Sequence, residues 1–203
     1  METPVFRVHA FPGSGNCYKL TLMLSLLGEP FEVRTVDLLG GETRSEAFLR
    51  INPHGKVPVL ELPDGRYLPE SNAGLWYLAE GSDFLPETRL GRARVLQWLS
   101  FEQYSHEPNI AVARFWIKFL NRPPEREREL LERQDRGRAA LQIMEHHLSS
   151  RDWFVGPECT IADVALYAYT HVAGEGGFEL DTYPAIRAWL RRVAALPRYA
   201  PMT

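Results

Sequence analysis

Residues 5–28 read VFRVHAFPGSGNCYKLTLMLSLLG, and this stretch decides the fold. Its first six residues have the composition of a β-strand, and the turn-forming segment 11–15 then interrupts them. The apolar residues that follow have the i, i+3, i+4, i+7 spacing of an amphipathic helix: Leu20, Met23, Leu24 and Leu27. Gly28 comes directly after the last turn, where glycine commonly ends a helix. The stretch therefore predicts a strand, a tight turn and a helix over 16–27.

The alternation of strands and helices continues to residue 80. A second strand, a short helix, two short strands and a further helix are predicted in turn over 31–37, 45–51, 57–60, 67–68 and 70–80. Asp64-Gly65 between the two short strands is a hairpin signal. The order βαβ, short helix, ββα predicts a sheet with helices packed on it.

Beyond Pro86 the pattern becomes helical throughout. Residues 88–120 are rich in apolar and aromatic side chains without strand alternation, and Pro123-Pro124 ends that segment. Three further helical patterns occupy 130–148, 161–172 and 183–196. The predicted fold class is therefore α/β plus all-α, with a small α/β domain over 1–80 followed by an all-helical domain over 88–203.

The composition narrows the class of protein. The chain has 203 residues, 45% hydrophobic and 24% charged, which are ordinary globular values, and a net charge of −3. That charge does not favour nucleic acid or an anionic membrane as a partner. Two cysteines exclude a disulfide scaffold and a multi-cysteine zinc site. Because no membrane span or signal-peptide pattern is present, we expect a cytoplasmic protein. The mixed charges of 125–138 predict a solvated helix face, with pairs such as Glu129–Arg133.

The turn before the first helix is the strongest candidate site. A helix N-terminus carries unpaired N–H groups and a partial positive charge, which favour an anion. Ser14 and Cys17 have the C-x-x-C spacing with serine in the first position. Ser14 could donate a hydrogen bond to a thiolate that a ligand brings in, or it could be an ordinary N-cap. Cys17 and Cys159 are more typical of packed, unreactive thiols.

Two further stretches contain candidate binding residues. In the first, Val57-Pro58 enters a strand where proline sits at a start or an edge and can be cis, so that the Val57 main chain could pair with an extended peptide. An ordinary turn proline is the alternative. In the second, Ser71 at a helix start could bind a carboxylate while Glu70 pairs with an ammonium group. Simple helix capping would explain the same Glu-Ser pair.

Three segments, taken in their order along the chain, resemble the cytosolic glutathione transferase family. They are Ser14 with its helix, Asn52-Pro53 to Lys56-Val57-Pro58, and Glu70-Ser71. The resemblance extends into the second half of the chain, where Thr160-Ile161-Ala162-Asp163 resembles the capping motif that starts a buried helix of that family. It implies a thioredoxin-like domain that binds glutathione, a helical domain that supplies the electrophile pocket, and a homodimer.

The resemblance also implies roles for individual residues. Ser14 would hold the glutathione sulfur as in serine-type members, with Asn16 as a second candidate, since no tyrosine stands at the position that tyrosine-type members use. The residues implied to bind the rest of glutathione are Val57 and cis Pro58 at the cysteinyl backbone, Glu70 and Ser71 at the γ-glutamyl end, and Lys56 and Arg44 near the glycine carboxylate.

The helical segment 98–116 is the expected lid over the second substrate. The side chains proposed to line it are Tyr104, Arg114 and Phe115, although aromatic residues at helical spacing are commonly core. The predicted activity is attack of a glutathione thiolate on a small hydrophobic electrophile, with glutathione as co-substrate and no metal or other cofactor. A glutathione-dependent disulfide reductase or peroxidase, and a non-catalytic ligand-binding protein of the same fold, are the two alternatives.

Overall fold

The computed structural model describes residues 5–202, which form two compact units. The first unit contains the described residues up to Ser82 together with those from Leu196 onward, and the second spans Asp83–Ala195. The segment 196–202, called the tail below, was predicted as part of the helical domain. It packs on the first unit instead, because α8 (Pro184–Ala194) ends before it and Pro197 cannot continue a helix.

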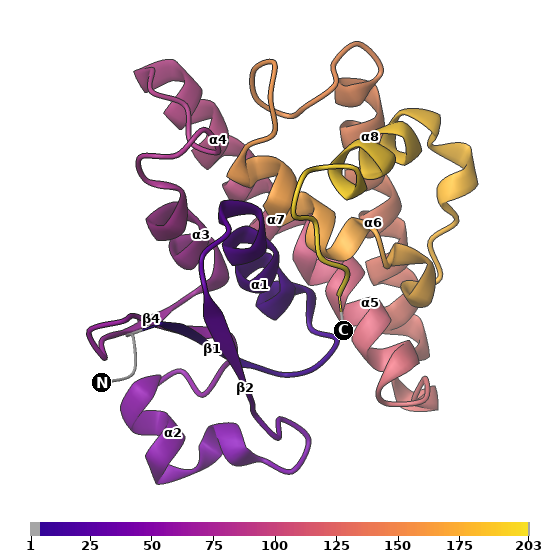
Figure 1. The fold of residues 1–203 in the computed structure, drawn as a ribbon. Coiled ribbons are helices and arrows are strands. Elements are labelled where there is room, and N and C mark those ends of the chain that lie inside the picture. The colour runs from indigo at the N-terminus through magenta and orange to yellow at the C-terminus, as the bar shows by residue number, and fades with distance from the viewer. Residues whose placement is uncertain (1–4, 203) are drawn as a thin grey trace. The chain divides into compact units, whose positions relative to one another are not determined.

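The first unit is a four-stranded mixed sheet with helices on both faces (Figure 1). Its strands are β1 (Phe6–Ala10), β2 (Phe31–Thr35), β3 (Val59–Glu61) and β4 (Tyr67–Pro69), in the order β2-β1-β3-β4. Its helices are α1 (Gly15–Leu27), α2 (Glu46–Ile51) and α3 (Ser71–Ala79), with a 3₁₀ turn at Glu42–Arg44. β1 and β2 are parallel, and the other pairs are antiparallel. This arrangement confirms the predicted thioredoxin-like domain.

The main core of this unit lies between the sheet and helices α1 and α3. Side chains alternate along a strand, so Val8 and its partner Leu60 share one face of the sheet, and both are fully buried. α1 and α3 approach so closely that a Cβ placed on Gly74 would lie 2.6 Å from Leu20 Cδ2. The packing of the two helices therefore leaves little room for a side chain at this position.

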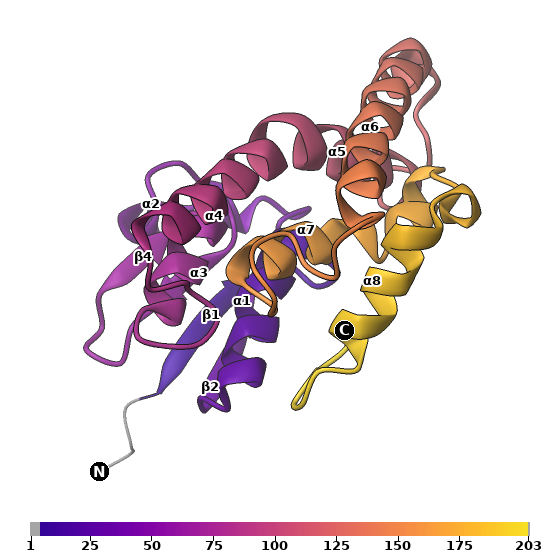
Figure 2. The same ribbon diagram turned by 90° about the horizontal axis from the view of Figure 1, so that it is seen from above.

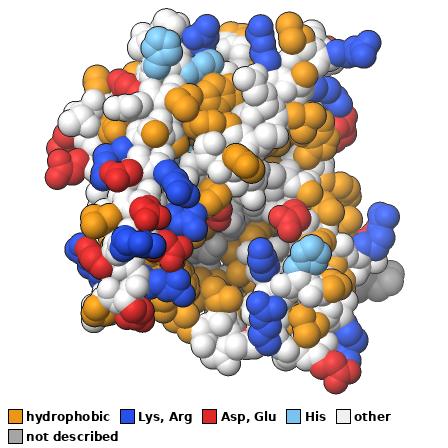
Figure 3. Space-filling model, turned by 180° about the vertical axis from the view of Figure 1, so that it is seen from behind, with side chains coloured by type: hydrophobic (Ala, Val, Ile, Leu, Met, Phe, Trp, Pro, Cys, Tyr) orange, Lys and Arg blue, Asp and Glu red, His pale blue; other side chains and the backbone are white. Residues whose placement is uncertain are grey.

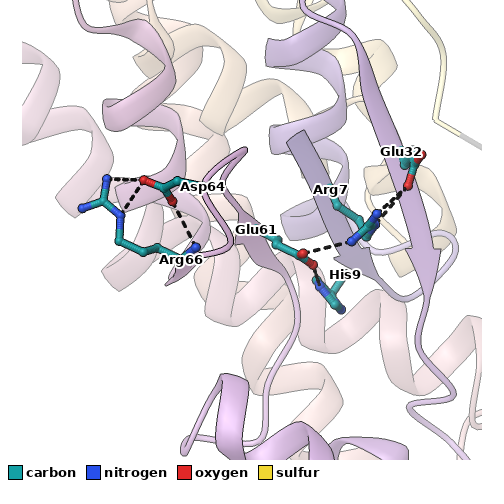
Figure 4. Close-up of polar contacts among 6 residues, drawn as sticks. All are labelled: Arg7, His9, Glu32, Glu61, Asp64 and Arg66. Atoms are coloured by element: carbon teal, nitrogen blue, oxygen red, sulfur yellow. Dashed lines mark hydrogen bonds and ion pairs between the residues drawn. The ribbon is translucent and has the colours of Figure 1, made fainter. Parts of the chain in front are cut away.

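The opposite face of the sheet carries a small apolar cluster and a polar network. Phe48 of α2 packs against Val36 and Val59. Further along the strands, Glu61 accepts hydrogen bonds from Arg7 at 2.9 Å and lies 2.8 Å from His9 Nε2 (Figure 4). Burial raises the pKa of Glu61, but its bonds to His9 and Arg7 outweigh this and hold the pKa below its usual value. Glu61 is therefore a carboxylate that fixes β3 to β1.

Local signals define the ends of α1 as predicted. Ser14 is the N-cap, and Gly28 at the C-cap has φ 73, a left-handed conformation that glycine adopts without strain. The tail then lies along this helix. Tyr18 Oη donates to the carbonyl of Ala200 at 2.7 Å, and Ser25 Oγ donates to that of Arg198 at 2.6 Å. These bonds attach the tail to one side of α1.

The second unit is helical throughout its described secondary structure (Figure 2). Its α-helices are α4 (Arg89–Phe101), α5 (Glu107–Lys118), α6 (Glu127–Leu148), α7 (Ile161–Thr170) and α8, with a π-helical turn at Glu102–His106 between α4 and α5 and 3₁₀ turns at Pro124–Arg126, Ala173–Gly176 and Leu180–Thr182. All 10 residues of α7 are buried, so this helix forms the centre of the unit. In the described range 5–202, none of the helices is long and apolar enough to cross a membrane.

The predicted capping box begins α7. The backbone N–H of Thr160 donates to Asp163 Oδ2 at 2.9 Å, and Thr160 Oγ1 accepts from the N–H of Ala162 at 3.3 Å. Asp163 also accepts from Trp189 Nε1 at 2.9 Å, which connects α7 to α8. Burial raises the pKa of Asp163 to about 6, because its hydrogen-bond donors are all neutral groups.

The charged stretch around the start of α6 is solvated as expected. Glu129 pairs with Arg133 at 3.4 Å, and Glu132 lies 3.7 Å from Arg128. In Figure 3, cationic and anionic side chains are interspersed on the face shown. Exposed pairs of this kind contribute little to stability, typically below about 1 kcal/mol each.

Candidate functional site

The sheet register brings the three predicted site stretches to one end of the first unit. His9 near the end of β1 pairs with Val59 at the start of β3, and Val59 pairs with Pro69 at the end of β4. The three segments that contain the predicted site residues therefore lie at the same end of the sheet. They are the turn after β1, the segment before β3 and the start of α3. Ser14, Val57-Pro58 and Glu70-Ser71 belong to these three segments.

Ser14 caps α1 through the acceptor side of its hydroxyl. Its Oγ accepts a hydrogen bond from the N–H of Cys17 at 3.4 Å, and its carbonyl accepts from Tyr18 at 2.9 Å. A hydroxyl has one donor hydrogen and two acceptor lone pairs. The capping role and the predicted donation to a thiolate are therefore compatible, and both occur at the positive end of a helix dipole.

Asn16 and Ser71 belong to one hydrogen-bonded cluster between α1 and α3. Ser71 Oγ donates to Asn16 Oδ1 at 3.3 Å and accepts from Lys19 Nζ at 3.3 Å. Lys19 Nζ also donates to Asn72 Oδ1 at 3.1 Å. The carbonyl oxygen of Asn16 thus faces the start of α3.

Lys19 is a member of this cluster that sequence reasoning did not single out. Its side chain is fully buried, although lysine is rarely buried without specific partners. The sequence feature that indicates a buried lysine is its position next to Leu20, on the core-facing side of a largely apolar helix. At such a position a charge needs a structural or functional reason.

Glu70 does not cap α3. It occupies the N-cap position but makes no capping hydrogen bond from its side chain in the part of the chain that the structure describes, and its φ of 70 lies in a region that non-glycine residues rarely adopt. Backbone strain of this kind is found at functional sites. The simple capping alternative is therefore wrong for Glu70, whose side chain does not cap the helix.

The segment before β3 has the main-chain groups that a peptide ligand needs. The Val57–Pro58 peptide bond is cis, as the resemblance implied. Within residues 5–202, the N–H and C=O of Val57 make no hydrogen bond to the protein. They are therefore available to pair with an extended peptide backbone.

Two exposed cationic residues, Arg44 and Lys56, belong to this part of the first unit. A Cβ placed on Gly55 would lie 2.7 Å from Arg44 Nη1, so the Arg44 guanidinium packs directly over Gly55. Lys56 is the next residue, and both cationic side chains are exposed. Exposed cations attract carboxylates, and the roles of Arg44 and Lys56 at the glycine end of glutathione stay a prediction.

Both cysteines are free thiols, and both are buried. Burial raises the pKa of Cys17 to about 11, although hydrogen bonds from Ser14 and Phe11 oppose that rise. Burial likewise raises the pKa of Cys159 well above its usual value. Both pKa shifts favour the protonated thiol at neutral pH. Residues 5–202 also contain no group of three or more His, Cys, Asp and Glu side chains that could hold a metal ion.

The structure does not bring together the three residues proposed to line the electrophile pocket. Tyr104 is 89% exposed on the π-helical turn. Arg114 is buried in the helical unit, where its Nε donates to Glu175 Oε2 at 2.6 Å. Phe115 packs against Phe119 with ring centroids 5.6 Å apart. Arg114 therefore has a structural role, because its guanidinium connects α5 to the turn at 173–176.

Comparisons with known proteins cover both units. The family profile described as "Glutathione S-transferase, N-terminal domain" matches residues 13–80, and the corresponding C-terminal domain profile matches 108–197. A crystal structure of a glutathione S-transferase from Pseudomonas fluorescens Pf-5 is 56% identical, with a TM-score of 0.96 over 98% of both chains. The chain belongs to the glutathione S-transferase family.

Two relatives from other organisms share less of the sequence. Glutathione S-transferase theta-1 of Mus musculus is 34% identical over 179 residues, which cover 82% of this chain and 72% of that protein. Elongation factor 1-gamma of Artemia salina is 28% identical over 178 residues, which cover 83% of this chain but 40% of that protein. Sequence similarity to this chain therefore extends to proteins that have different names and different lengths.

Proposed function

We propose that this protein is a glutathione transferase in which Ser14 stabilises the glutathione thiolate for attack on a neutral, apolar electrophile. The observation that carries the proposal is the pairing of His9, Val59 and Pro69 across three neighbouring strands. Because of this pairing, the three segments proposed to bind glutathione lie at one end of the sheet. Each segment offers a group suited to one part of the tripeptide.

The assignment follows the charges and donors of glutathione. The γ-glutamyl carboxylate binds the N–H groups at the start of α3, and its ammonium group pairs with Glu70. The cysteinyl backbone pairs with the main chain of Val57 next to cis Pro58. The glycine carboxylate lies near Lys56 and Arg44. This placement brings the sulfur to the N-terminus of α1 and to Ser14.

Ionising the thiol of bound glutathione near neutral pH requires only a modest free energy. A free thiol with a pKa of ~8.5 is only a few per cent thiolate at neutral pH. Lowering that pKa by one to two units takes about 1.4–2.7 kcal/mol, which one charge-assisted hydrogen bond and a helix terminus can supply. The sulfur then forms a C–S bond, and the leaving group departs with its electron pair. Glutathione is the co-substrate, and the reaction needs no other cofactor.

An assay of glutathione consumption with three acceptors tests the proposal. We expect turnover with 1-chloro-2,4-dinitrobenzene and a loss of at least tenfold in kcat/KM for Ser71→Ala. Turnover with a mixed disulfide or cumene hydroperoxide alone would instead assign the reductase or peroxidase activity. Both of those activities would use the same thiolate.

A non-catalytic role is the second candidate, because the chain also resembles part of elongation factor 1-gamma. It predicts no turnover with any of the three acceptors, even where calorimetry shows that glutathione binds. The strained φ of Glu70 and the accessible main chain of Val57 favour a working glutathione site over this candidate.

We also propose that two copies form a homodimer. Each unit exposes large apolar or aromatic side chains, for example Tyr67 and Tyr77 (both 45% exposed) in the first unit and Leu90 (62%) in the second. Light scattering coupled to size-exclusion chromatography tests this, with twice the chain mass of 23.2 kDa as the expected result.

A further inference from the structure

β2 is an edge strand of the sheet, and among the described residues it pairs only with β1. The N–H of Val36, directly after β2, donates to the carbonyl of Ala10 in β1 at 2.8 Å. Main-chain groups alternate in direction along a strand, so those of Phe31, Val33 and Thr35 point away from β1. Within residues 5–202 these groups make no hydrogen bond to the rest of the protein. β2 therefore presents unpaired donors and acceptors on its outer side.

The side chains of β2 differ between the two faces of the sheet. Val33 pairs with the core residue Val8 and so lies on the face that carries α1, yet its side chain is 54% exposed. Glu32 and Arg34 lie on the opposite face, where Glu32 pairs with Arg7 at 2.9 Å (Figure 4). The side chains of Glu32 and Arg34 are both largely exposed. The strand therefore has an exposed apolar residue between two exposed charges of opposite sign.

This order of charges makes β2 complementary to a reversed copy of itself. Glu32 precedes Val33 and Arg34 follows it. In an antiparallel pair of β2 strands with the two Val33 residues opposite each other, Glu32 of each copy faces Arg34 of the other. Opposite charges that face each other across two strands stabilise the pair, whereas like charges destabilise it. A parallel pair in the same register would place like charges opposite each other, so the charges favour the antiparallel arrangement.

We propose that β2, residues Phe31–Thr35, is a self-association surface to which a second copy of this chain adds its own β2, antiparallel about a two-fold axis at Val33. In this register the outward N–H and C=O of Val33 pair with those of Val33 in the second copy, and the two exposed valine side chains cover each other. Charged residues on an edge strand commonly prevent association, but in β2 they match those of the reversed copy.

The inference goes beyond the proposed function, because it needs no bound glutathione. It also uses a different surface from the exposed residues named above for the homodimer, which lie outside β2. Two interfaces that each join two copies extend an assembly beyond two chains. We therefore expect the average mass of the wild-type protein to rise with concentration above the mass that the homodimer surface alone provides.

Sedimentation equilibrium over a range of protein concentrations tests the inference with two charge variants. Glu32→Arg places arginine opposite Arg34 at both symmetric contacts, and Arg34→Glu places glutamate opposite Glu32. Each variant should weaken the association through β2 roughly tenfold or more, because two attractive contacts become repulsive. Glu46→Arg makes the same change of charge at an exposed position of α2 and is the matched control. It should associate as the wild type does.

An equimolar mixture of Glu32→Arg and Arg34→Glu separates strand pairing from a general effect of charge. In a mixed pair, both cations of one chain face both anions of the other, so the mixture should recover the association that each variant alone has lost. Val33→Pro removes the central outward N–H without removing a bond to β1, and proline is tolerated at such a position of an edge strand. It should lose the association while its circular dichroism stays that of the wild type.

Two results would overturn the inference. One is an equal average mass for wild type, Glu32→Arg and Arg34→Glu at every concentration. The other is a mixture of the two charge variants whose mass does not exceed that of either variant alone. The homodimer is measured separately, by the mass that both charge variants retain, and turnover of glutathione by the variants reports the proposed function independently of either interface.

Discussion

Lys19 Nζ, fully buried in the first unit, lies 3.3 Å from Ser71 Oγ and donates a hydrogen bond to it. The ammonium group therefore sits behind the residue that begins α3. It orients the Ser71 hydroxyl toward Asn16, to which that hydroxyl donates. It also adds positive charge at a helix N-terminus, where the γ-glutamyl carboxylate of glutathione is proposed to bind. Lys19 acts through Ser71 and is a positioning residue.

Replacing Lys19 should weaken glutathione binding more than it slows chemistry. Hydrogen bonds from charged groups contribute about 1.5–3 kcal/mol, so Lys19→Met should raise the KM for glutathione roughly tenfold or more while kcat changes less than about threefold. Steady-state kinetics at varied glutathione concentration measures the two constants separately. A double-mutant cycle with Ser71→Ala should show that the two effects are not additive. A fall in kcat with unchanged KM would contradict this role.

Cys17 should resist alkylation in the folded protein. Because burial raises its pKa to about 11, only ~0.1% of the thiol is ionised at pH 8. We expect iodoacetamide to leave both cysteines unmodified in the native protein and to modify both in denaturant, as measured by intact mass. Rapid native modification of Cys17 would show that the thiol is activated and would support its use in catalysis.

Ionisation of Asp163 should make stability depend on pH. The folded pKa of about 6 lies above the ordinary value of 3.8, so between these pH values the folded state holds a proton that the unfolded state has lost. The free energy of unfolding should therefore fall as pH rises from about 4 to 6, by up to about 3 kcal/mol from this group.

Asp163→Asn isolates that contribution. Denaturant unfolding of both proteins at pH 4.5 and pH 6.5 gives the difference in stability at each pH. We expect the variant to gain stability relative to wild type as the pH rises. If the difference stayed constant, the pKa of Asp163 would be the same in the folded and unfolded states.

Gly74 tests how α1 and α3 pack. A Cβ at this position would lie 2.6 Å from Leu20 Cδ2, and Leu20 is buried, so Gly74→Ala should destabilise the protein by about 1–3 kcal/mol. Gly174→Ala is the control, because a Cβ there meets nothing within 4 Å. In urea unfolding, the midpoint of Gly74→Ala should lie clearly below the midpoint of Gly174→Ala. Equal midpoints would mean that α1 and α3 can move apart without cost.

The sequence predicts most of the secondary structure because local signals define it. The α1 helix has a serine N-cap, an apolar stripe and a left-handed glycine at its end, and each of these acts within a few residues. The same holds for the capping box of α7. Such signals identify a helix without knowledge of what it packs against.

Features that depend on distant residues were predicted less well. The ion pair of Arg114 with Glu175 and the bond between Lys19 and Ser71 join residues far apart in the chain, so periodicity does not reveal them. The sequence predicts that the tail belongs to the helical domain over 88–203. Its actual position depends on hydrogen bonds to Tyr18 and Ser25 in α1.

The central claim is that Ser14 stabilises the thiolate of bound glutathione. The most direct measurement is the titration of that thiolate by its ultraviolet absorbance in wild type and Ser14→Ala, with Cys17→Ala as the control. We predict a wild-type midpoint one to two units below the free-thiol value of ~8.5, a midpoint at least about one unit higher in Ser14→Ala, and no change in Cys17→Ala. An unchanged midpoint in Ser14→Ala that still binds glutathione would contradict the claim.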